Sequence, residues 1–285
     1  MQIGYVGLGN MGAPMVERLL AQGVATRVYD IAPDPVKALV AKGAASAGSP
    51  RALAEGCDVI GVCVPEDEHV LSVLRGPEGL LAGAKPGSVI AVHSTILPAT
   101  AERAAAEAAE RGVGVLDACV TGGADRALKG QLTYLVGGDT THVERARAYM
   151  LVCAEKIVHA GPIGSGAKLK LCINLITYLQ WTAAYESMLL AKAVGLPQAM
   201  LEEAGLSNGQ MTELMVAYLR THKLPDAARK SAPAQKLLRG HMHTAEKDLA
   251  WALKLAREAG VALPGAALAS QQMARLYGVE DEGRR

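Results

Sequence analysis

A glycine-rich segment near the start of the chain has the spacing of a loop that binds a pyrophosphate group. It follows the apolar run Ile3 to Val6 and opens the helical pattern Asn10 to Gln22, which is the context that such a loop requires. Three glycines at this spacing allow a tight turn, a close approach of the backbone to phosphate and close packing of helix on strand. The helix N-terminus adds free N–H groups and a partial positive charge. The sequence therefore predicts a dinucleotide site formed by Gly7-Leu8-Gly9-Asn10-Met11-Gly12.

Asp30 closes the second expected strand, Ala25 to Asp30, and stands 23 residues after Gly7. A carboxylate at this place accepts hydrogen bonds from the adenosine ribose hydroxyls, and it repels the 2′-phosphate that distinguishes NADP from NAD. The three residues that follow, Ile31 to Pro33, bring no cation to bind such a phosphate. The sequence therefore favours NAD over NADP as the cofactor.

Short apolar runs alternate with helical patterns over the first 160 or so residues, as they do in α/β proteins. We expect a Rossmann domain over residues 1–162, with a doubly wound parallel sheet. Besides those named above, the expected strands are Val59 to Val64, Ser88 to Val92, Gly114 to Val120 and Leu132 to Val136, and the expected helices are Asp34 to Ala41 and Ala99 to Arg111.

Strand patterns stop after this point, and we expect an all-helical domain over residues 163–285. Its longest helix is predicted from Lys168 to Ala193, with shorter ones at Gln198 to Ala204, Met211 to Arg220 and Ala245 to Ala259. The polar segment Thr221 to Arg239 contains two prolines and is predicted to be mobile. The longest helix carries apolar residues on more than one face, which predicts a homodimer or homotetramer.

Composition excludes several classes of protein. The formal net charge is +1, so charge gives no reason to expect nucleic acid or a membrane surface as partner. The longest apolar stretch, Leu171 to Leu190, is interrupted by Asn174, Gln180 and Glu186, and glycines break the apolar run at the N-terminus. We therefore expect a cytoplasmic protein. None of the five cysteines forms a C-x-x-C pair, so we expect buried, reduced thiols and no metal site.

Four segments, in order along nearly the whole chain, resemble the β-hydroxyacid dehydrogenases, the family of 3-hydroxyisobutyrate dehydrogenases and tartronate semialdehyde reductases. The first is the glycine-rich segment Gly7 to Gly12. The second, Asp117 to Gly123, is similar to the family's substrate-binding D-A-P-V-S-G-G. The third runs from Gly161 to Gly166 and continues to Lys170 and Asn174, and the fourth is Lys247-Asp248-Leu249. The resemblance implies hydride transfer between NAD(H) and a small 3-hydroxy acid or its semialdehyde.

The resemblance also implies roles for individual residues. Lys170 would be the general acid/base, and Asn174, four residues later, shares its helix face. A free lysine has a pKa of about 10.4, so partial burial and the positive nicotinamide ring would have to lower it. Thr121, Gly122 and Gly123 would bind the substrate carboxylate, because they offer a hydroxyl and adjacent N–H groups. The remaining contacts to the cofactor would come from Val64, Pro65, Thr95 and Lys247.

The chain departs from the family pattern at several positions. Cys119 stands in place of proline, Thr121 in place of serine, and Ile173 in place of an asparagine. His93 replaces an apolar residue, and the segment from Gly240 to His243 lacks the usual aromatics. The acid/base and cofactor positions are intact, so these changes bear on the substrate, as do Arg126 and Lys129 just beyond Gly123.

Two other functions remain open from the sequence. An imine reductase resembles this family but usually lacks the lysine, and a catalytically silent dinucleotide-binding protein typically loses it as well. Lys170 argues against both. A 6-phosphogluconate dehydrogenase would need a much longer helical domain than this chain of 285 residues provides.

Overall fold

The computed structural model describes residues 1–280, which fold into two compact units. The first unit is Met1–Lys170, and the second begins at Leu171. An unbroken helix, α9 (Ser165–Ala193), starts in the first unit and continues into the second.

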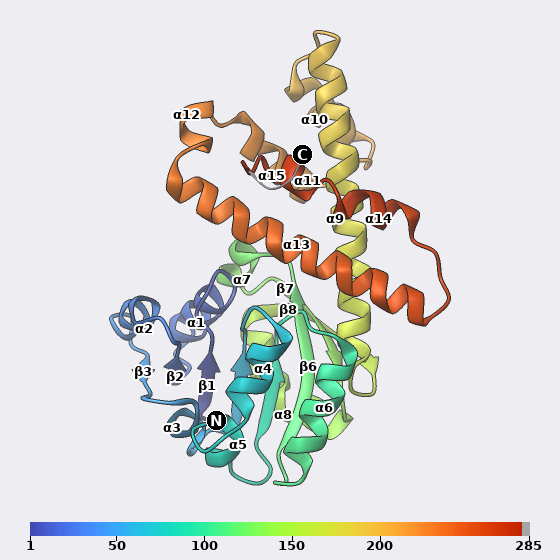
Figure 1. The fold of residues 1–285 in the computed structure, drawn as a ribbon. Coiled ribbons are helices and arrows are strands. Elements are labelled where there is room, and N and C mark those ends of the chain that lie inside the picture. The colour runs from blue at the N-terminus through green and yellow to red at the C-terminus, as the bar shows by residue number, and fades with distance from the viewer. Residues whose placement is uncertain (281–285) are drawn as a thin grey trace. The chain divides into compact units, whose positions relative to one another are not determined.

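The first unit is built on a sheet of eight strands in the order β3-β2-β1-β4-β5-β6-β7-β8, as far as the described residues show (Figure 1). The strands are β1 (Ile3–Val6), β2 (Thr26–Tyr29), β3 (Ala45–Ser46), β4 (Val59–Val62), β5 (Val89–Val92), β6 (Gly114–Thr121), β7 (Leu132–Gly137) and β8 (Ala154–Gly161). The six strands β1 to β6 are parallel, so their carboxyl ends lie along one edge of the sheet. Each expected strand is present within one or two residues of its expected ends.

The end of the sheet differs from the purely parallel arrangement that we predicted. β7 pairs antiparallel with β6, and β8 pairs parallel with β7. Only residues 122–131 connect β6 to β7, and a parallel crossover needs a dozen or more. β8 escaped prediction because it is an edge strand whose sequence, Ala154 to Gly161, has polar residues on both sides and no continuous apolar run.

Helices cover both faces of the sheet and bury two apolar cores. One core packs α1, α2, α7 and α8 on one face, and the other packs α3, α4, α5 and α6 on the opposite face. Such a doubly wound sheet buries each strand on both sides, which explains the continuous apolar runs of β1, β4 and β5. These helices are α1 (Gly12–Ala21), α2 (Pro33–Val40), α3 (Pro50–Ala54), α4 (Asp67–Leu74), α5 (Leu80–Gly83), α6 (Pro98–Ala109), α7 (Ala124–Lys129) and α8 (Thr140–Cys153).

The described part of the second unit is all helical, as predicted. Besides α9 it contains α10 (Gln198–Ser207), α11 (Glu213–Arg220), a 3₁₀ turn (Thr221–Lys223), α12 (Asp226–Arg229), α13 (Ala232–Glu258), α14 (Pro264–Ser270) and α15 (Met273–Tyr277). The segment 221–239, for which no helix was predicted, is helical over most of its length. Pro225 directly precedes α12, and Pro233 lies in the first turn of α13, where proline favours a helix rather than breaking it.

The long helix α9 buries one stripe of its surface. Leu171, Asn174, Tyr178, Met188 and Ala191 are buried at helical spacing, while Ile176, Leu179 and Leu190 on the other side are exposed. Cys172 is also exposed, which corrects the expectation that all five cysteines are buried, and Cys63 is half-buried. Among the described helices, including α9, none is both long and apolar enough to cross a membrane.

Candidate active site

The glycine-rich loop has the geometry that a pyrophosphate needs. Gly7 has a φ of +89°, a backbone conformation that residues other than glycine rarely adopt. A Cβ at Gly12 would overlap the carbonyl oxygen of Gly7, so the third glycine lets α1 start against the loop. A Cβ at Gly9, in contrast, would meet no atom within 4 Å. The space beside Gly9 is therefore open, as the close approach of a dinucleotide phosphate requires.

Asp30 is fixed beside this loop. Its Oδ2 accepts a hydrogen bond from the backbone N–H of Leu8 at 2.6 Å, and its Oδ1 accepts one from Ala32 at 2.8 Å. Each oxygen keeps a second lone pair, with which it can accept a hydrogen bond from a ribose hydroxyl. Ile31 is 92% exposed and has no charge to offer a 2′-phosphate. Leu8 and Asp30 are 22 positions apart in the sequence, yet their hydrogen bond joins the loop and the acidic residue into one site that fits NAD.

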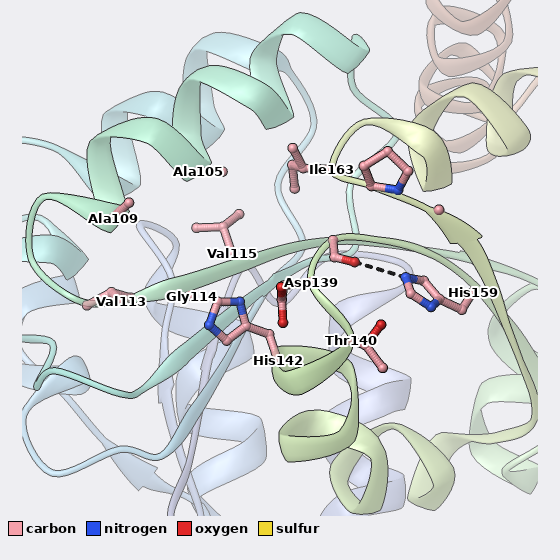
Figure 2. Close-up of a pocket in the computed structure, with 13 residues that line it drawn as sticks. Ala105, Ala109, Val113, Gly114, Val115, Asp139, Thr140, His142, His159 and Ile163 are labelled. Carbon is pink, nitrogen blue, oxygen red and sulfur yellow. Dashed lines mark hydrogen bonds between the residues drawn. The ribbon is translucent and has the colours of Figure 1, made fainter.

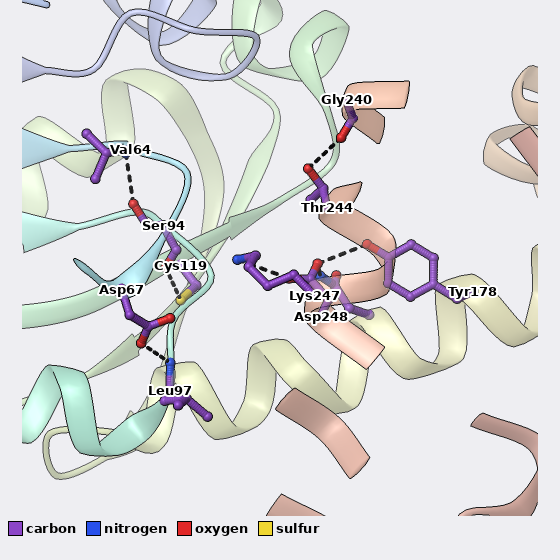
Figure 3. A network of polar contacts seen from close by, with 11 residues as sticks. Val64, Asp67, Ser94, Leu97, Cys119, Tyr178, Gly240, Thr244, Lys247 and Asp248 are labelled. Carbon is purple, nitrogen blue, oxygen red and sulfur yellow. Dashed lines mark hydrogen bonds and ion pairs between the residues drawn. The ribbon is translucent and has the colours of Figure 1, made fainter. Parts of the chain in front are cut away.

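The carboxyl ends of β4 and β5 are joined by Ser94, to which the sequence assigned no role of its own. Its Oγ accepts a hydrogen bond from the N–H of Val64 at 2.9 Å, which holds the Val64-Pro65 segment against the end of β5 (Figure 3). Asp67 accepts a second bond between these segments from the N–H of Leu97, also at 2.9 Å. Ser94 directly precedes Thr95, and this adjacency was the available indication of its role. Thr95 therefore lies in a segment that is hydrogen-bonded at Ser94 and at Leu97 to the residues that follow β4.

Asp117 holds the start of α9, the helix that carries Lys170. The side chain is fully buried, and its two oxygens accept hydrogen bonds from the N–H groups of Gly164 at 2.9 Å and Ala167 at 2.7 Å. Burial raises the pKa of Asp117 above its ordinary value, and these N–H groups oppose the rise. A carboxylate at a helix N-terminus binds N–H groups that have no partner within the helix. Lys170 follows Ala167 by three residues, or about 4.5 Å along the helix axis.

Two glycines bring α9 this close to the sheet. A Cβ at Gly166 would overlap the backbone oxygens of Asp117 and Leu135, and one at Gly137 would overlap the Asp117 carboxylate. The backbone of α9 therefore lies directly on β6 and β7 at these points. Lys170 is half-buried and Lys168 is exposed, as expected for side chains on different faces of the helix.

β6 thus contributes to the expected site at two places. Asp117, in its middle, holds α9, and its carboxyl end leads into Thr121, Gly122 and Gly123. Both glycines have positive φ, +128° and +81°, so this turn requires glycine at each position. The aliphatic part of Arg126 lies against Gly122, and its guanidinium donates to the carbonyl of Gln131 at 2.9 Å.

His93 is a buried part of the sheet and not a metal ligand. Its ring bonds to the backbone oxygen of Ala118 and to the hydroxyl of Tyr149, both at 2.8 Å. Burial lowers the pKa of His93 to about 4, so the imidazole is neutral at neutral pH. No group of three metal-ligating side chains occurs in the described residues.

Asn174, in the second unit, belongs to a buried network centred on Asp248. The carboxylate Oδ2 accepts hydrogen bonds from Asn174 Nδ2 at 2.6 Å and from the Tyr178 hydroxyl at 2.9 Å. Lys247 Nζ lies 3.3 Å from the other oxygen, Oδ1 (Figure 3). Burial and the charge of Asp248 raise the pKa of Tyr178 well above its usual value, so this group donates. Because Asp248 can only accept, it fixes the Asn174 amide with its NH₂ towards Asp248.

The predicted residues therefore fall into groups that the structure joins within each unit. In the first unit, Asp30 joins the glycine-rich loop and Ser94 joins Val64 to the segment of Thr95. In the second unit, Asp248 joins Asn174 and Lys247. The sequence shows Asp117 and Asp248 only as parts of motifs, and it does not predict that they accept buried hydrogen bonds.

A cavity of about 620 Å³ in the first unit lies just before the start of α9, and none of the predicted site residues lines it (Figure 2). It is lined by the start of β6 at Gly114, the ends of β7 and β8, and His142 and His159. Because Gly114 and Thr121 are at opposite ends of β6, this cavity lies at the opposite edge of the sheet from the predicted substrate loop.

Two family models match consecutive parts of the chain. The model of the NAD binding domain of 6-phosphogluconate dehydrogenase matches residues 2–161. The model described as NAD-binding of NADP-dependent 3-hydroxyisobutyrate dehydrogenase matches residues 164–284.

Individual relatives agree with these matches. An NAD-dependent L-serine dehydrogenase of Pseudomonas aeruginosa is 40% identical over 202 residues, which are 71% of this chain and 68% of the relative. The 2-(hydroxymethyl)glutarate dehydrogenase of Eubacterium barkeri is 32% identical over 272 residues, 95% of this chain and 87% of the relative. The solved structure of a Mycobacterium tuberculosis 3-hydroxyisobutyrate dehydrogenase with L-serine has a TM-score of 0.78 at 30% identity, covering 97% of this chain and 94% of that one.

The fold and the site define an NAD-binding oxidoreductase with a Rossmann unit and a helical unit. The chain belongs to the β-hydroxyacid dehydrogenase family, whose members here are named as dehydrogenases of small hydroxy acids. The family predicted from the four sequence segments is therefore confirmed.

The anchoring of α9 by Asp117 can be tested with Asp117→Asn. The amide is uncharged and can accept only through its oxygen, so one N–H of the helix start loses its acceptor and faces an NH₂ group, at a cost of about 2 kcal/mol. We expect the free energy of unfolding, measured in urea, to fall by this amount and kcat to fall with it.

Asp139→Asn is the matched control, because Asp139 accepts from Thr141 N–H at the exposed start of α8. Its loss of stability should be smaller, about 1 kcal/mol or less. Equal losses in the two variants would contradict a special function for Asp117.

Proposed function

We propose that this protein uses NAD to oxidise a small 3-hydroxy acid, or NADH to reduce the matching semialdehyde, with Lys170 as the general acid/base. The observation that carries this proposal is the attachment of the Lys170 helix, through Asp117, to the strand that ends in Thr121-Gly122-Gly123. A proton-transfer group and an anion-binding turn are thereby mounted on the same two rigid elements. We retain residues 1–162 and 163–285 as the cofactor-binding and substrate domains of this proposal.

The glycine-rich loop and Asp30 fit the dinucleotide, as the open space at Gly9 and the free lone pairs of Asp30 indicate. Bound NAD supplies the hydride acceptor. In the oxidation, Lys170 takes the proton from the substrate hydroxyl; in the reduction, it returns a proton to the oxygen. Val64, Pro65, Thr95 and Lys247 are proposed to contact the cofactor.

Asn174 is proposed to orient Lys170. The two residues are four positions apart on α9, and the Asn174 amide is held by Asp248 so that its oxygen remains an acceptor for the lysine ammonium. Thr121, Gly122 and Gly123 are proposed to bind the substrate carboxylate through a hydroxyl and backbone N–H groups. The proposed substrates therefore share a carboxylate and a hydroxyl on the β carbon, as L-serine and 2-(hydroxymethyl)glutarate do.

Two further properties are proposed. Five cysteines without a disulfide among the described residues support a reducing compartment, and we propose the cytoplasm. The exposed apolar side of the second unit supports self-association as a homodimer or homotetramer. It includes Ile176, which is 52% exposed, and Leu190, which is 65% exposed.

The oligomer is tested by the mass in solution at micromolar concentration, which should be at least that of a dimer. Leu190→Glu should shift the mass towards the monomer, because it places a charge on the apolar side of α9. Lys192→Glu, two residues further and on another side of the helix, should leave the mass unchanged. A monomeric parent protein would contradict the proposal.

Cofactor preference is tested by Asp30→Ser combined with Ile31→Arg. Removing a unit charge about 4 Å from the phosphate is worth about 1–4 kcal/mol, so the preference should move towards NADP by about tenfold or more. The measurement is the ratio of kcat/KM for the two cofactors. A parent protein that already binds NADP more tightly than NAD would show that Asp30 does not select the cofactor.

The catalytic proposal is tested by Lys170→Ala, assayed with a substrate that the parent turns over. Candidates are L-serine, 2-(hydroxymethyl)glutarate and 3-hydroxyisobutyrate with NAD, and methylmalonate semialdehyde and tartronate semialdehyde with NADH. Loss of general acid/base catalysis should lower kcat by about 10²–10⁴ while the affinity for NAD stays nearly unchanged. Lys170→Arg should not restore activity, because a guanidinium stays protonated.

Lys168→Ala is the control, since Lys168 is exposed on another face of α9. Comparable turnover in the Lys170 and Lys168 variants would remove Lys170 from the mechanism.

A further inference from the structure

Side chains connect β5 and β6 beyond the last residues that pair through their backbones, Val92 and Asp117. His93 Nδ1 lies 2.8 Å from the backbone oxygen of Ala118, and Cys119 Sγ donates to the backbone oxygen of Ser94 at 3.3 Å. Each strand therefore sends one side chain to the backbone of the other. We call these two bonds the crossed pair. Both side chains stand where the chain departs from the family pattern.

The His93 ring can adopt only one arrangement of protons. A backbone oxygen only accepts, so Nδ1 must carry the proton that it donates to Ala118. Nε2 then has a lone pair, which accepts from the Tyr149 hydroxyl at 2.8 Å. The ring is 3% exposed and lies between three tyrosine rings, with centroids 5.4–5.9 Å away. Both nitrogens are thus engaged, and neither hydrogen bond faces solvent.

Neighbouring elements prevent this arrangement from shifting. Tyr149 comes from α8, and its hydroxyl fits under the sheet because β4 has a glycine there. A Cβ at Gly61 would overlap the Tyr149 hydroxyl and the Tyr5 ring. The backbone N–H of His93 also donates to Val62 on β4 at 2.7 Å. His93 is therefore held to β4 through its backbone, and to β6 and α8 through its ring.

The segments that leave the crossed pair are those on which the proposed reaction depends. Two residues after His93 comes Thr95, proposed to contact the cofactor, and two residues after Cys119 comes Thr121, proposed to bind the substrate. The crossed pair joins the two strands only two residues before these positions. A connection this near can hold the cofactor side and the substrate side of the proposed site at a fixed spacing.

We propose that His93 is a positioning residue for hydride transfer, acting through its bond to Ala118 to hold the segments of Thr95 and Thr121 at a fixed spacing. This inference rests on the proposed function. The rate of transfer depends steeply on such spacing, and a misplacement of about 1 Å can cost about 100-fold. Loosening the bond should therefore lower kcat much more than it changes KM or the affinity for NAD.

Two substitutions separate the two bonds of the ring. In His93→Asn the side-chain NH₂ reaches about the position of Nδ1, so the bond to Ala118 is kept and the bond to Tyr149 is lost. In His93→Gln the NH₂ reaches about the position of Nε2, so the bond to Ala118 is lost. We expect His93→Gln to lower kcat by about 10- to 100-fold with KM nearly unchanged, and His93→Asn to keep most of the activity.

Amide hydrogen exchange reports on the crossed pair without any turnover. Residues 94–97 and 119–123 should exchange faster in His93→Gln than in His93→Asn. Each variant loses one buried bond, so a general loss of stability would affect both, and urea unfolding measures that loss separately. Tyr5→Phe is the control, because the Tyr5 ring stacks on the His93 ring while its hydroxyl donates to Met15 Sδ at 3.2 Å, so the change removes a neighbouring buried hydroxyl without removing either bond of the His93 ring, and it should change neither exchange nor kcat.

Equal kcat values in the Asn and Gln variants, or equal exchange in the two segments, would overturn the proposal. A parent protein that turns over none of the candidate acids would overturn the proposed function instead. In that case faster exchange in the Gln variant alone would still support His93 as the connection between the segments, and equal exchange would still refute it.

Discussion

The buried carboxylate of Asp117 at the start of α9 is the interaction on which the site in the first unit depends. An ionised group away from water is costly unless it is fully hydrogen-bonded, and here the N–H groups of Gly164 and Ala167 meet its two oxygens. Separating α9 from β6 would leave both the charge and the helix N-terminus without partners. The position of the α9 backbone that carries Lys170 therefore follows from an electrostatic requirement of the fold.

The second unit uses the same device. Asp248, 2% exposed, holds Asn174 and Tyr178 on α9 as Asp117 holds the helix start. Each acidic residue belongs to one of the four segments that resemble the family, yet neither needs to react. Each one orders donors around a buried charge, and truncating it would leave those donors unsatisfied. The residues that take part in chemistry can then be few, because their geometry is imposed by their neighbours.

The sequence predicts those parts of the structure whose cause is local. The glycine spacing, Asp30 at the end of β2 and the apolar runs of the parallel strands each follow from a short stretch of chain. The antiparallel direction of β7 follows from the length of its connection to β6, and the edge strand β8 is too exposed to show an apolar run. The start of α13 includes a first-turn proline. Hydrophobic periodicity alone predicts none of these three features. Asp117 and Asp248 act over separations of 47 to 74 residues, so no local pattern could show which donors they meet.

The close approach of α9 to the sheet also determines where this protein can change. Positions 137 and 166 have no room for a single added carbon, and positions 122 and 123 require a backbone conformation that only glycine adopts easily. A library that randomises these four positions would consist largely of destabilised members. Diversity introduced at Lys129, which is exposed on α7, leaves this framework untouched. In directed evolution, variation is therefore accessible at exposed positions of this kind, while the frame beneath them behaves as an invariant scaffold.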